Sequence, residues 1–123
     1  DATGEIIELI CSYIPGTVGQ DPPEGVRPRG VIHWVSATNS VDCDLYCYEK
    51  LFTVAAPDAG EESFIDHLNP DSLQIIKQCK AELGLAGAEV GQHFQFEREG
   101  YYAVDAKHSS AGKLVFNRTI ALR

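Results

Sequence analysis

The sequence lacks the features that mark most membrane proteins and common enzymes. None of its apolar runs approaches the roughly 20 residues that a bilayer-spanning helix needs. It contains no G-x-x-x-x-G-K-[ST] or G-x-G-x-x-G phosphate loop, no G-x-S-x-G nucleophile elbow and no H-E-x-x-H metal helix. We therefore expect no membrane association and no catalytic residue in this chain.

Basic residues are also scarce. Ten Lys and Arg stand against eighteen Asp and Glu, which gives a formal net charge of −8. This sign is wrong for a non-specific nucleic-acid binder, so we expect no general DNA binding, and a polyanionic partner would need a local basic surface.

Metal-binding spacings are missing as well. The four cysteines include no C-x-x-C pair, and the four histidines are scattered, so no zinc-ligand pattern forms and we expect no metal site. Free cysteine is among the most buried residue types, which predicts buried free thiols. The cysteines are Cys11, Cys43, Cys47 and Cys79.

The chain has neither an initiating methionine nor a basic-then-apolar signal segment. It starts on a turn-like Asp1–Gly4 and stops within an apolar stretch, Ile120–Arg123, that is typical of a strand. We expect an intracellular, cytoplasmic fragment of a longer protein. Its 123 residues suit one domain or two small ones.

Short β-strands dominate the pattern, because no segment sustains three turns of helical periodicity. A turn-rich loop is predicted over Pro15–Arg29, and a capping box, with Ser63 facing the Asp66 amide, predicts one short helical turn. The connection Ala81–Gly91 suits a second turn. We predict an all-β, mainly antiparallel barrel, since closure hides strand edges. The predicted strands are Glu5–Tyr13, Gly30–Ser36, Val41–Tyr48, Leu73–Lys80, a hairpin over Phe94–Tyr102, and Leu114–Ile120.

One catalytic alternative uses His33 with Asp42 or Asp44 as a hydrolase. No fixed spacing joins the histidine to a second catalytic group, so a core or half-buried structural histidine is favoured. The two aspartates alternate with apolar residues on one strand, which is typical of a solvated face. Val41, Cys43, Leu45 and Cys47 would then face the core.

The hairpin Phe94–Tyr102 concentrates the groups that could bind a partner. Its turn is expected at Glu99–Gly100, where glycine can take positive φ. Gln95 and Arg98 fall on opposite faces of a simple two-residue repeat, so a bulge, or a long reach from the turn, would be needed to bring them together. Amide, guanidinium and aromatic groups suit single-stranded RNA, and a plain hairpin with a packed aromatic core fits the same residues.

Four stretches together resemble the C-terminal anticodon-binding region of the glutaminyl-tRNA synthetase family, in the family's order and over nearly the whole chain. R-G-V-I-H-W-V-S-A and F-Q-F-E-R-E-G-Y are the most specific, and the F-N-R-T ending favours the glutaminyl over the related glutamyl-tRNA synthetases. The stretches are Arg29–Ala37, Leu68–Leu73, Phe94–Tyr102 and Val115–Thr119.

The resemblance implies parts of two six-stranded barrels, like those of a ribosomal protein fold, that grip a tRNA anticodon loop. Residues 1–50 would belong to the barrel distal to the catalytic core and residues 51–123 to the proximal one. Gln95 is implied to hydrogen-bond the central anticodon base, with Arg98 assisting, while Arg118 and Lys113 are weaker candidates for phosphate contacts.

The catalytic core, which uses ATP with magnesium to attach glutamine to tRNA, is implied upstream in the same chain, in a parent that is expected to be monomeric. This fragment would contribute no chemistry and hold no cofactor. Where the family commonly has an arginine on the strand before the L-F pair, this sequence has Tyr46, so no RNA contact is expected on that strand. A glutamyl-tRNA synthetase barrel and a non-catalytic protein-interaction barrel remain the alternatives.

Overall fold

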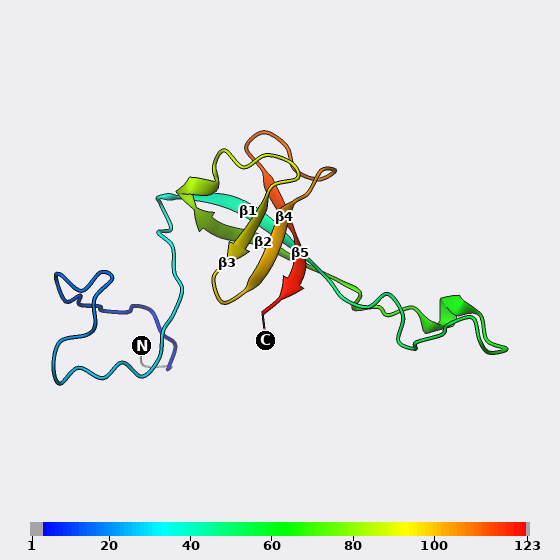
Figure 1. Ribbon diagram of the computed structural model, residues 1–123, viewed down its shortest axis with the longest axis horizontal. Helices are drawn as coiled ribbons and strands as arrows, with labels where there is room; N and C mark the ends of the chain where they lie inside the picture. The colour runs from blue at the N-terminus through cyan, green and yellow to red at the C-terminus, as the bar shows by residue number, and fades with distance from the viewer. Residues whose placement is uncertain (1–3, 123) are drawn as a thin grey trace. The chain divides into compact units, whose positions relative to one another are not determined.

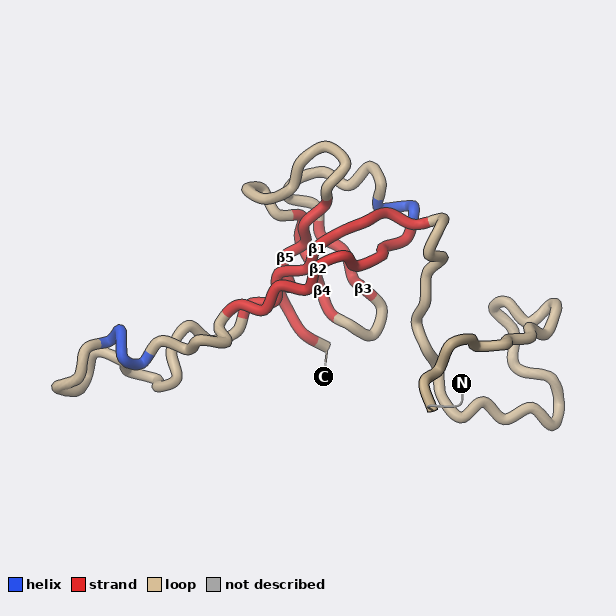
Figure 2. The backbone as a smooth tube through the Cα atoms, turned by 180° about the vertical axis from the view of Figure 1, so that it is seen from behind, coloured by secondary structure: helices blue, strands red, loops and turns tan. Residues whose placement is uncertain are grey.

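The computed structural model describes residues 4–122, whose regular structure is a five-stranded sheet with two short 3-10 helices. The strands lie side by side in the order β2-β1-β5-β4-β3, as Figure 1 and Figure 2 show from opposite sides. The predicted mainly-β class with one or two helical turns is confirmed. The elements are β1 (Ser40–Tyr48), η1 (Phe64–His67), β2 (Leu73–Glu82), η2 (Leu83–Leu85), β3 (His93–Phe96), β4 (Gly100–Val104) and β5 (Leu114–Ala121).

The sheet is mixed rather than purely antiparallel. Three neighbouring pairs are antiparallel, but β1 and β5 pair in parallel. Parallel neighbours need a long connection, and here the whole of β2, β3 and β4 intervenes in the sequence. Among the described residues β2 and β3 remain as sheet edges, so these strands alone do not close the expected barrel.

The core lies on the inner face of the curved sheet. The ring of Phe96 stacks on Tyr102 with centroids 4.5 Å apart, and Phe116, which is fully buried, meets Phe96 and Phe94 edge-on at 5.2 and 6.1 Å. The buried members of this cluster are Cys43, Ala81, Tyr102, Val104 and Phe116.

The four thiols are free, as predicted, but they differ in burial. Cys43 and Cys47 are buried and Cys79 is half-buried, whereas Cys11 is exposed. The burial of Cys43 and Cys47 confirms the core face that the alternation along β1 predicted. The prediction of burial was wrong for Cys11, which lies in an irregular, exposed segment.

Two predicted strands, Glu5–Tyr13 and Gly30–Ser36, are wrong in this structure. Both segments are irregular and largely exposed, with Trp34 77% exposed. A strand requires a neighbour that takes its hydrogen bonds and covers its apolar face, and the described residues provide neither for these segments.

Contacts divide the chain into two compact units, Asp1–Ile32 and His33–Arg123. Within the first unit, residues 4–32 contain turns and bends but no strand or helix, which confirms the predicted loop over Pro15–Arg29. The turn expected at the start of the chain falls largely outside the described residues.

The segment between β1 and β2 extends their pairing and carries η1, the green helix of Figure 1. Backbone bonds from Glu49 to Ser72 and from Asn69 to Leu51 continue the ladder. Ser63 caps η1 as predicted, but its hydroxyl accepts from the Ile65 amide rather than from that of Asp66. The barrel boundary expected near Lys50 stays a prediction. In this sheet β1 lies between β2 and β5, and both of these strands follow it in the sequence.

Candidate nucleic-acid interface

The predicted hairpin forms from β3 and β4, with a turn displaced from the expected position. Gln95 pairs with Tyr101 and Phe96 with Gly100, which leaves residues 97–99 as the turn. The Glu99 amide donates to the Phe96 carbonyl at 3.0 Å. Gly100 has a positive φ, 156°, as the sequence predicted, and Arg98 also takes a positive φ, 68°. A glycine-like conformation at an arginine was not foreseen, because non-glycine residues rarely adopt it.

Gly100 is needed for a second reason besides its positive φ. A Cβ atom at this position would lie 2.5 Å from the carbonyl oxygen of Ile120, on β5. The absence of a side chain therefore allows the close approach of β4 to β5, and this contact fixes the hairpin on the sheet.

The structure resolves the conflict between Gln95 and Arg98. Gln95 lies on the exposed face of β3, opposite Phe94 and Phe96, whose rings pack in the core. Arg98 lies in the turn rather than on a strand, and its side chain is half exposed. Of the two arrangements expected, the structure has the one in which arginine extends from the turn.

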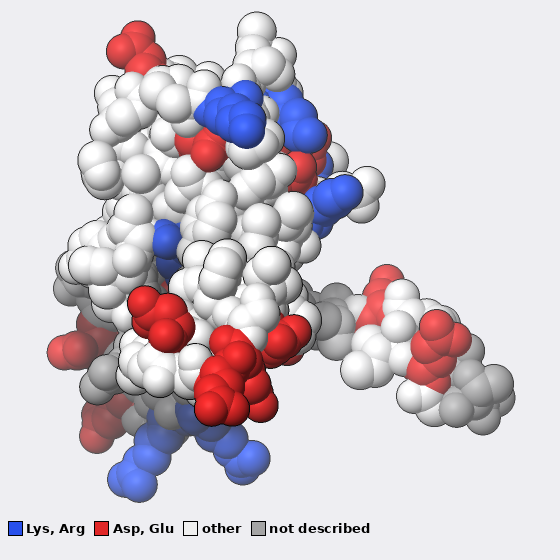
Figure 3. Space-filling view, turned by 90° about the vertical axis from the view of Figure 1, so that its right-hand side faces the viewer, with Lys and Arg blue, Asp and Glu red and all other residues white. Residues whose placement is uncertain are grey.

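Acidic neighbours surround the basic candidates. The Arg98 Nε lies 3.9 Å from Glu97 Oε1, and the Arg118 Nη2 donates to Glu49 Oε1 at 2.8 Å. Lys113 Nζ lies 3.4 Å from Asp44 Oδ2. In Figure 3, basic side chains stand among acidic ones, and the described atoms of that face form no continuous basic surface.

Arg118 and Lys113 lie apart from the exposed face that carries Gln95. Arg118 is in register with Tyr102 and Cys47, both buried, so it projects from the core face. Lys113 precedes β5, at the end of the sheet away from the hairpin turn. The structure thus brings only Gln95 and Arg98 together in one element.

The groups of the hydrolase alternative each have a different partner. His33 Nε2 lies 3.9 Å from Glu82 Oε1, and Asp42 Oδ1 lies 2.6 Å from Lys80 Nζ. The Gln78 amide donates to Asp44 Oδ1 and lowers the pKa of that carboxyl, against the opposing effect of burial. These separate pairings give no geometric support for a shared catalytic centre.

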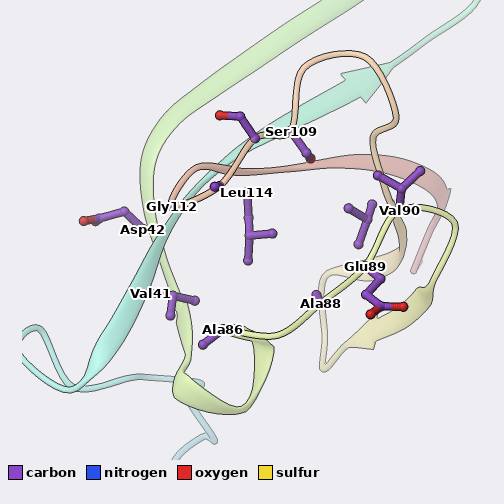
Figure 4. A pocket seen from close by; sticks show the side chains of 12 residues that line it. Val41, Asp42, Ala86, Ala88, Glu89, Val90, Ser109, Gly112 and Leu114 are labelled. Atoms are coloured by element: carbon purple, nitrogen blue, oxygen red, sulfur yellow. The ribbon is translucent and has the colours of Figure 1, made fainter.

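Several cavities adjoin the sheet in the described part of the chain, and two of them are relevant here. One of about 560 Å³ lies between β1, the segment after η2 and the loop before β5, where Val41 and Leu114 point inward and the Asp42 carboxylate points away (Figure 4). The other, of about 460 Å³, opens between the two sheet edges and includes Gln95 in its lining. The hairpin that carries Gln95 therefore borders an open groove of the molecule.

A buried polar cluster at the end of β4 was missed by the sequence reasoning. Burial alone would raise the pKa of Asp105, but hydrogen bonds from Asn117 Nδ2, the amides of His108 and Lys107 and the His108 ring lower it to about 2. The available signal was an aspartate between a strand and a polar turn, a common site of side-chain to backbone bonding. The cluster orders the loop before β5 and lies away from Gln95.

The described residues contain no group of three or more His, Cys, Asp or Glu side chains that could hold a metal ion. None of their helices is sufficiently long and apolar to span a membrane.

A family model described as the anti-codon binding domain of class I tRNA synthetases (E and Q) matches residues 31–105. That is more than half of the chain, so this chain belongs to the class I tRNA synthetase anticodon-binding domain family, as the sequence resemblance indicated.

Within this family, the chain is similar to curated glutamine–tRNA ligases. The chain is 52% identical over its whole length to glutamine–tRNA ligases of Ectopseudomonas mendocina and Pseudomonas aeruginosa, and 50% identical to that of Pseudomonas syringae pv. tomato. It spans 22% of the length of each of these relatives.

Proposed function

We propose that this chain is the anticodon-recognition part of a glutamine–tRNA ligase, in which Gln95 hydrogen-bonds the central anticodon base and Arg98 assists at the same nucleotide. The observation that carries the proposal is the placement of Gln95 on the exposed face of an edge strand, above the packed rings of Phe94 and Phe96. Because the strand already fixes the backbone of Gln95, binding has to order only its side chain.

The chemistry of the two side chains suits this role. A glutamine amide donates and accepts, so it can bond a complementary pair of groups on one base edge, and the planar arginine fork suits a carbonyl or a phosphate. Glu97 and Glu99 beside Arg98 oppose a dense phosphate contact, which favours recognition of an uncharged base by this hairpin.

The parent protein would attach glutamine to its tRNA with ATP and magnesium, as a cytoplasmic monomer. The groups of this chain do not fit those cofactors, because it has no phosphate loop and its described residues form no cluster suited to a metal. ATP and magnesium therefore belong to the catalytic core that we propose upstream, and no catalytic step is assigned to this chain.

The test replaces Gln95 with alanine in the intact ligase. Loss of one specific base contact typically costs about 1–3 kcal/mol of discrimination, which is about 5- to 150-fold. We expect kcat/KM for aminoacylation to lose this much preference for cognate tRNA over a tRNA altered at the central anticodon base. Amino-acid activation, measured by ATP–pyrophosphate exchange, should stay unchanged.

Gln74→Ala is the matched control. Gln74 is also an exposed glutamine on an edge strand, β2, but it pairs with Cys47 away from the hairpin. It should leave discrimination at wild-type level. Equal discrimination in the Gln95 variant and in wild type would contradict the proposed role.

A protein-binding module is the second candidate, favoured by the negative charge and by two sheet edges that are unpaired among the described strands. Nuclease footprinting separates the two functions. Protection of the anticodon loop by the intact protein supports the RNA role, and an unprotected loop supports the protein partner.

A further inference from the structure

The hairpin's aromatic side chains divide between its two faces. Phe94, Phe96 and Tyr102 pack with Phe116 inside the sheet, and Tyr102 is 2% exposed. Tyr101 projects from the other face, is 41% exposed, and has no ring partner and no side-chain hydrogen bond within residues 4–122. An exposed, unpartnered ring on an ordered strand is available for a ligand.

Tyr101 is also the neighbour of Gln95. The two residues are in-register partners of β3 and β4, which places their Cβ atoms on one face, about 5 Å apart. On the other side Tyr101 pairs with Ile120, which is likewise exposed. Gln95, Tyr101 and Ile120 thus form a row across three strands, with an amide at one end and apolar surface beside it.

The backbone of Tyr101 is held in place at a β-bulge. The register of β4 and β5 shifts between Tyr101 and Tyr102, and the Thr119 hydroxyl donates to the Tyr101 carbonyl at 3.0 Å. The unpaired residue, Thr119, lies on β5, so Ile120 shares the exposed face with Tyr101 while Arg118 shares the core face with Tyr102.

We propose that the ring of Tyr101 is the stacking surface for the nucleobase whose edge Gln95 hydrogen-bonds. This inference rests on the proposed function and adds a binding residue to it. A base that directs its polar edge at the Gln95 amide still exposes its flat face. The Tyr101 ring, on the neighbouring strand, can cover that face. Stacking needs no positive charge, so the acidic residues of the turn do not oppose it.

The test compares Tyr101→Leu and Tyr101→Phe in the intact ligase, with tRNA affinity as the readout. Leucine keeps an apolar side chain but removes the π face, and we expect the Kd for cognate tRNA to rise about tenfold. Because stacking tolerates any base, the Kd for a tRNA altered at the central anticodon base should rise by a similar factor. Phenylalanine keeps the ring and should bind within about twofold of wild type.

Tyr48→Leu is the matched control, since Tyr48 is 48% exposed at the end of β1, outside the hairpin, and should not affect binding. Wild-type affinity of Tyr101→Leu would overturn the inference, as would an equal loss in Tyr101→Phe, which would assign the contact to the hydroxyl. If Gln95→Ala loses discrimination while Tyr101→Leu binds normally, only this inference fails. If neither variant changes tRNA recognition, the proposed function fails with it.

Discussion

Asp105 shows how one residue can organise a loop. Its two carboxylate oxygens accept bonds from two backbone amides, the His108 ring and the Asn117 amide, and its side chain is largely buried. Four donors favour the charged form, so they outweigh the effect of burial and hold the pKa of Asp105 at about 2.

This lowered pKa predicts acid sensitivity. A carboxyl whose pKa is lower in the folded than in the unfolded state contributes stability above its unfolded value, near 4, and loses that contribution as the pH falls toward 2. Asp105→Asn should therefore destabilise the chain by about 2 kcal/mol at pH 7. The gap from wild type should narrow steadily below pH 4, as followed by urea unfolding; a constant gap at every pH would contradict the assignment.

Gly100 determines how closely β4 can approach β5. Because the position of a Cβ atom would lie 2.5 Å from the Ile120 oxygen, Gly100→Ala must push β4 away from β5 and shift the hairpin. We expect a loss of about 2 kcal/mol in unfolding free energy, the order typical of overpacking.

Gly87→Ala provides the comparison for Gly100, since nothing lies within 4 Å of a Cβ atom there. It should change the urea midpoint little. Equal effects of the two substitutions would show that the close approach of β4 and β5 is not what requires glycine.

At the scale of elements, the pairing of β1 with β2 predicts that two cysteines can form a disulfide. Cys43 and Cys79 are in-register partners, and the Cα separation of such a pair, about 4.5–5.5 Å, falls within the disulfide range. Copper–phenanthroline oxidation should join tryptic peptides 30–50 and 78–80. Burial raises the pKa of Cys43 to about 11, so the reaction calls for mildly alkaline conditions.

Single substitutions identify which thiol in peptide 30–50 reacts. Cys43→Ala should abolish the cross-link and Cys47→Ala should retain it, since Cys47 pairs with Gln74 instead. The reverse pattern, read by mass spectrometry, would mean that the β1–β2 register is wrong.

Local sequence signals predicted the paired elements but not their partners. The alternation along β1, the β2 pattern, the aromatic hairpin and the final strand all formed near their predicted bounds. Glu5–Tyr13 and Gly30–Ser36 have comparable patterns and formed no strand, because pairing depends on a partner that local sequence does not specify. The parallel β1–β5 pair was missed for the same reason.

The candidate site was predicted in part. The family resemblance predicted Gln95 and Arg98 as site residues. Alternation along the strand predicted that the two could not share a face of a simple strand, and Arg98 indeed lies in the turn. The positive φ of Arg98 could not be inferred, because it is set by the turn. The pairing of Tyr101 with Ile120 could not be inferred either, because it depends on a register shift between β4 and β5. The RNA contacts of Gln95, Arg98, Arg118 and Lys113 stay predictions.

At the scale of the whole molecule, charge and sheet edges set the conditions for binding. A net charge of −8 repels RNA at long range, and Lys113 and Arg118 already face carboxylates. Recognition by this chain should therefore depend on short-range contacts to bases, with most phosphate contacts made elsewhere in the parent protein.

A photo-cross-link at the central anticodon position tests this account most directly. A tRNA with 4-thiouridine at that position would be irradiated in complex with the intact ligase, and the linked tryptic peptide identified. We predict attachment within residues 81–98 or 99–107, which border the β3–β4 turn and contain Gln95 and Tyr101. Attachment to any other segment, with these two peptides unmodified, would contradict the claim that this hairpin recognises the anticodon.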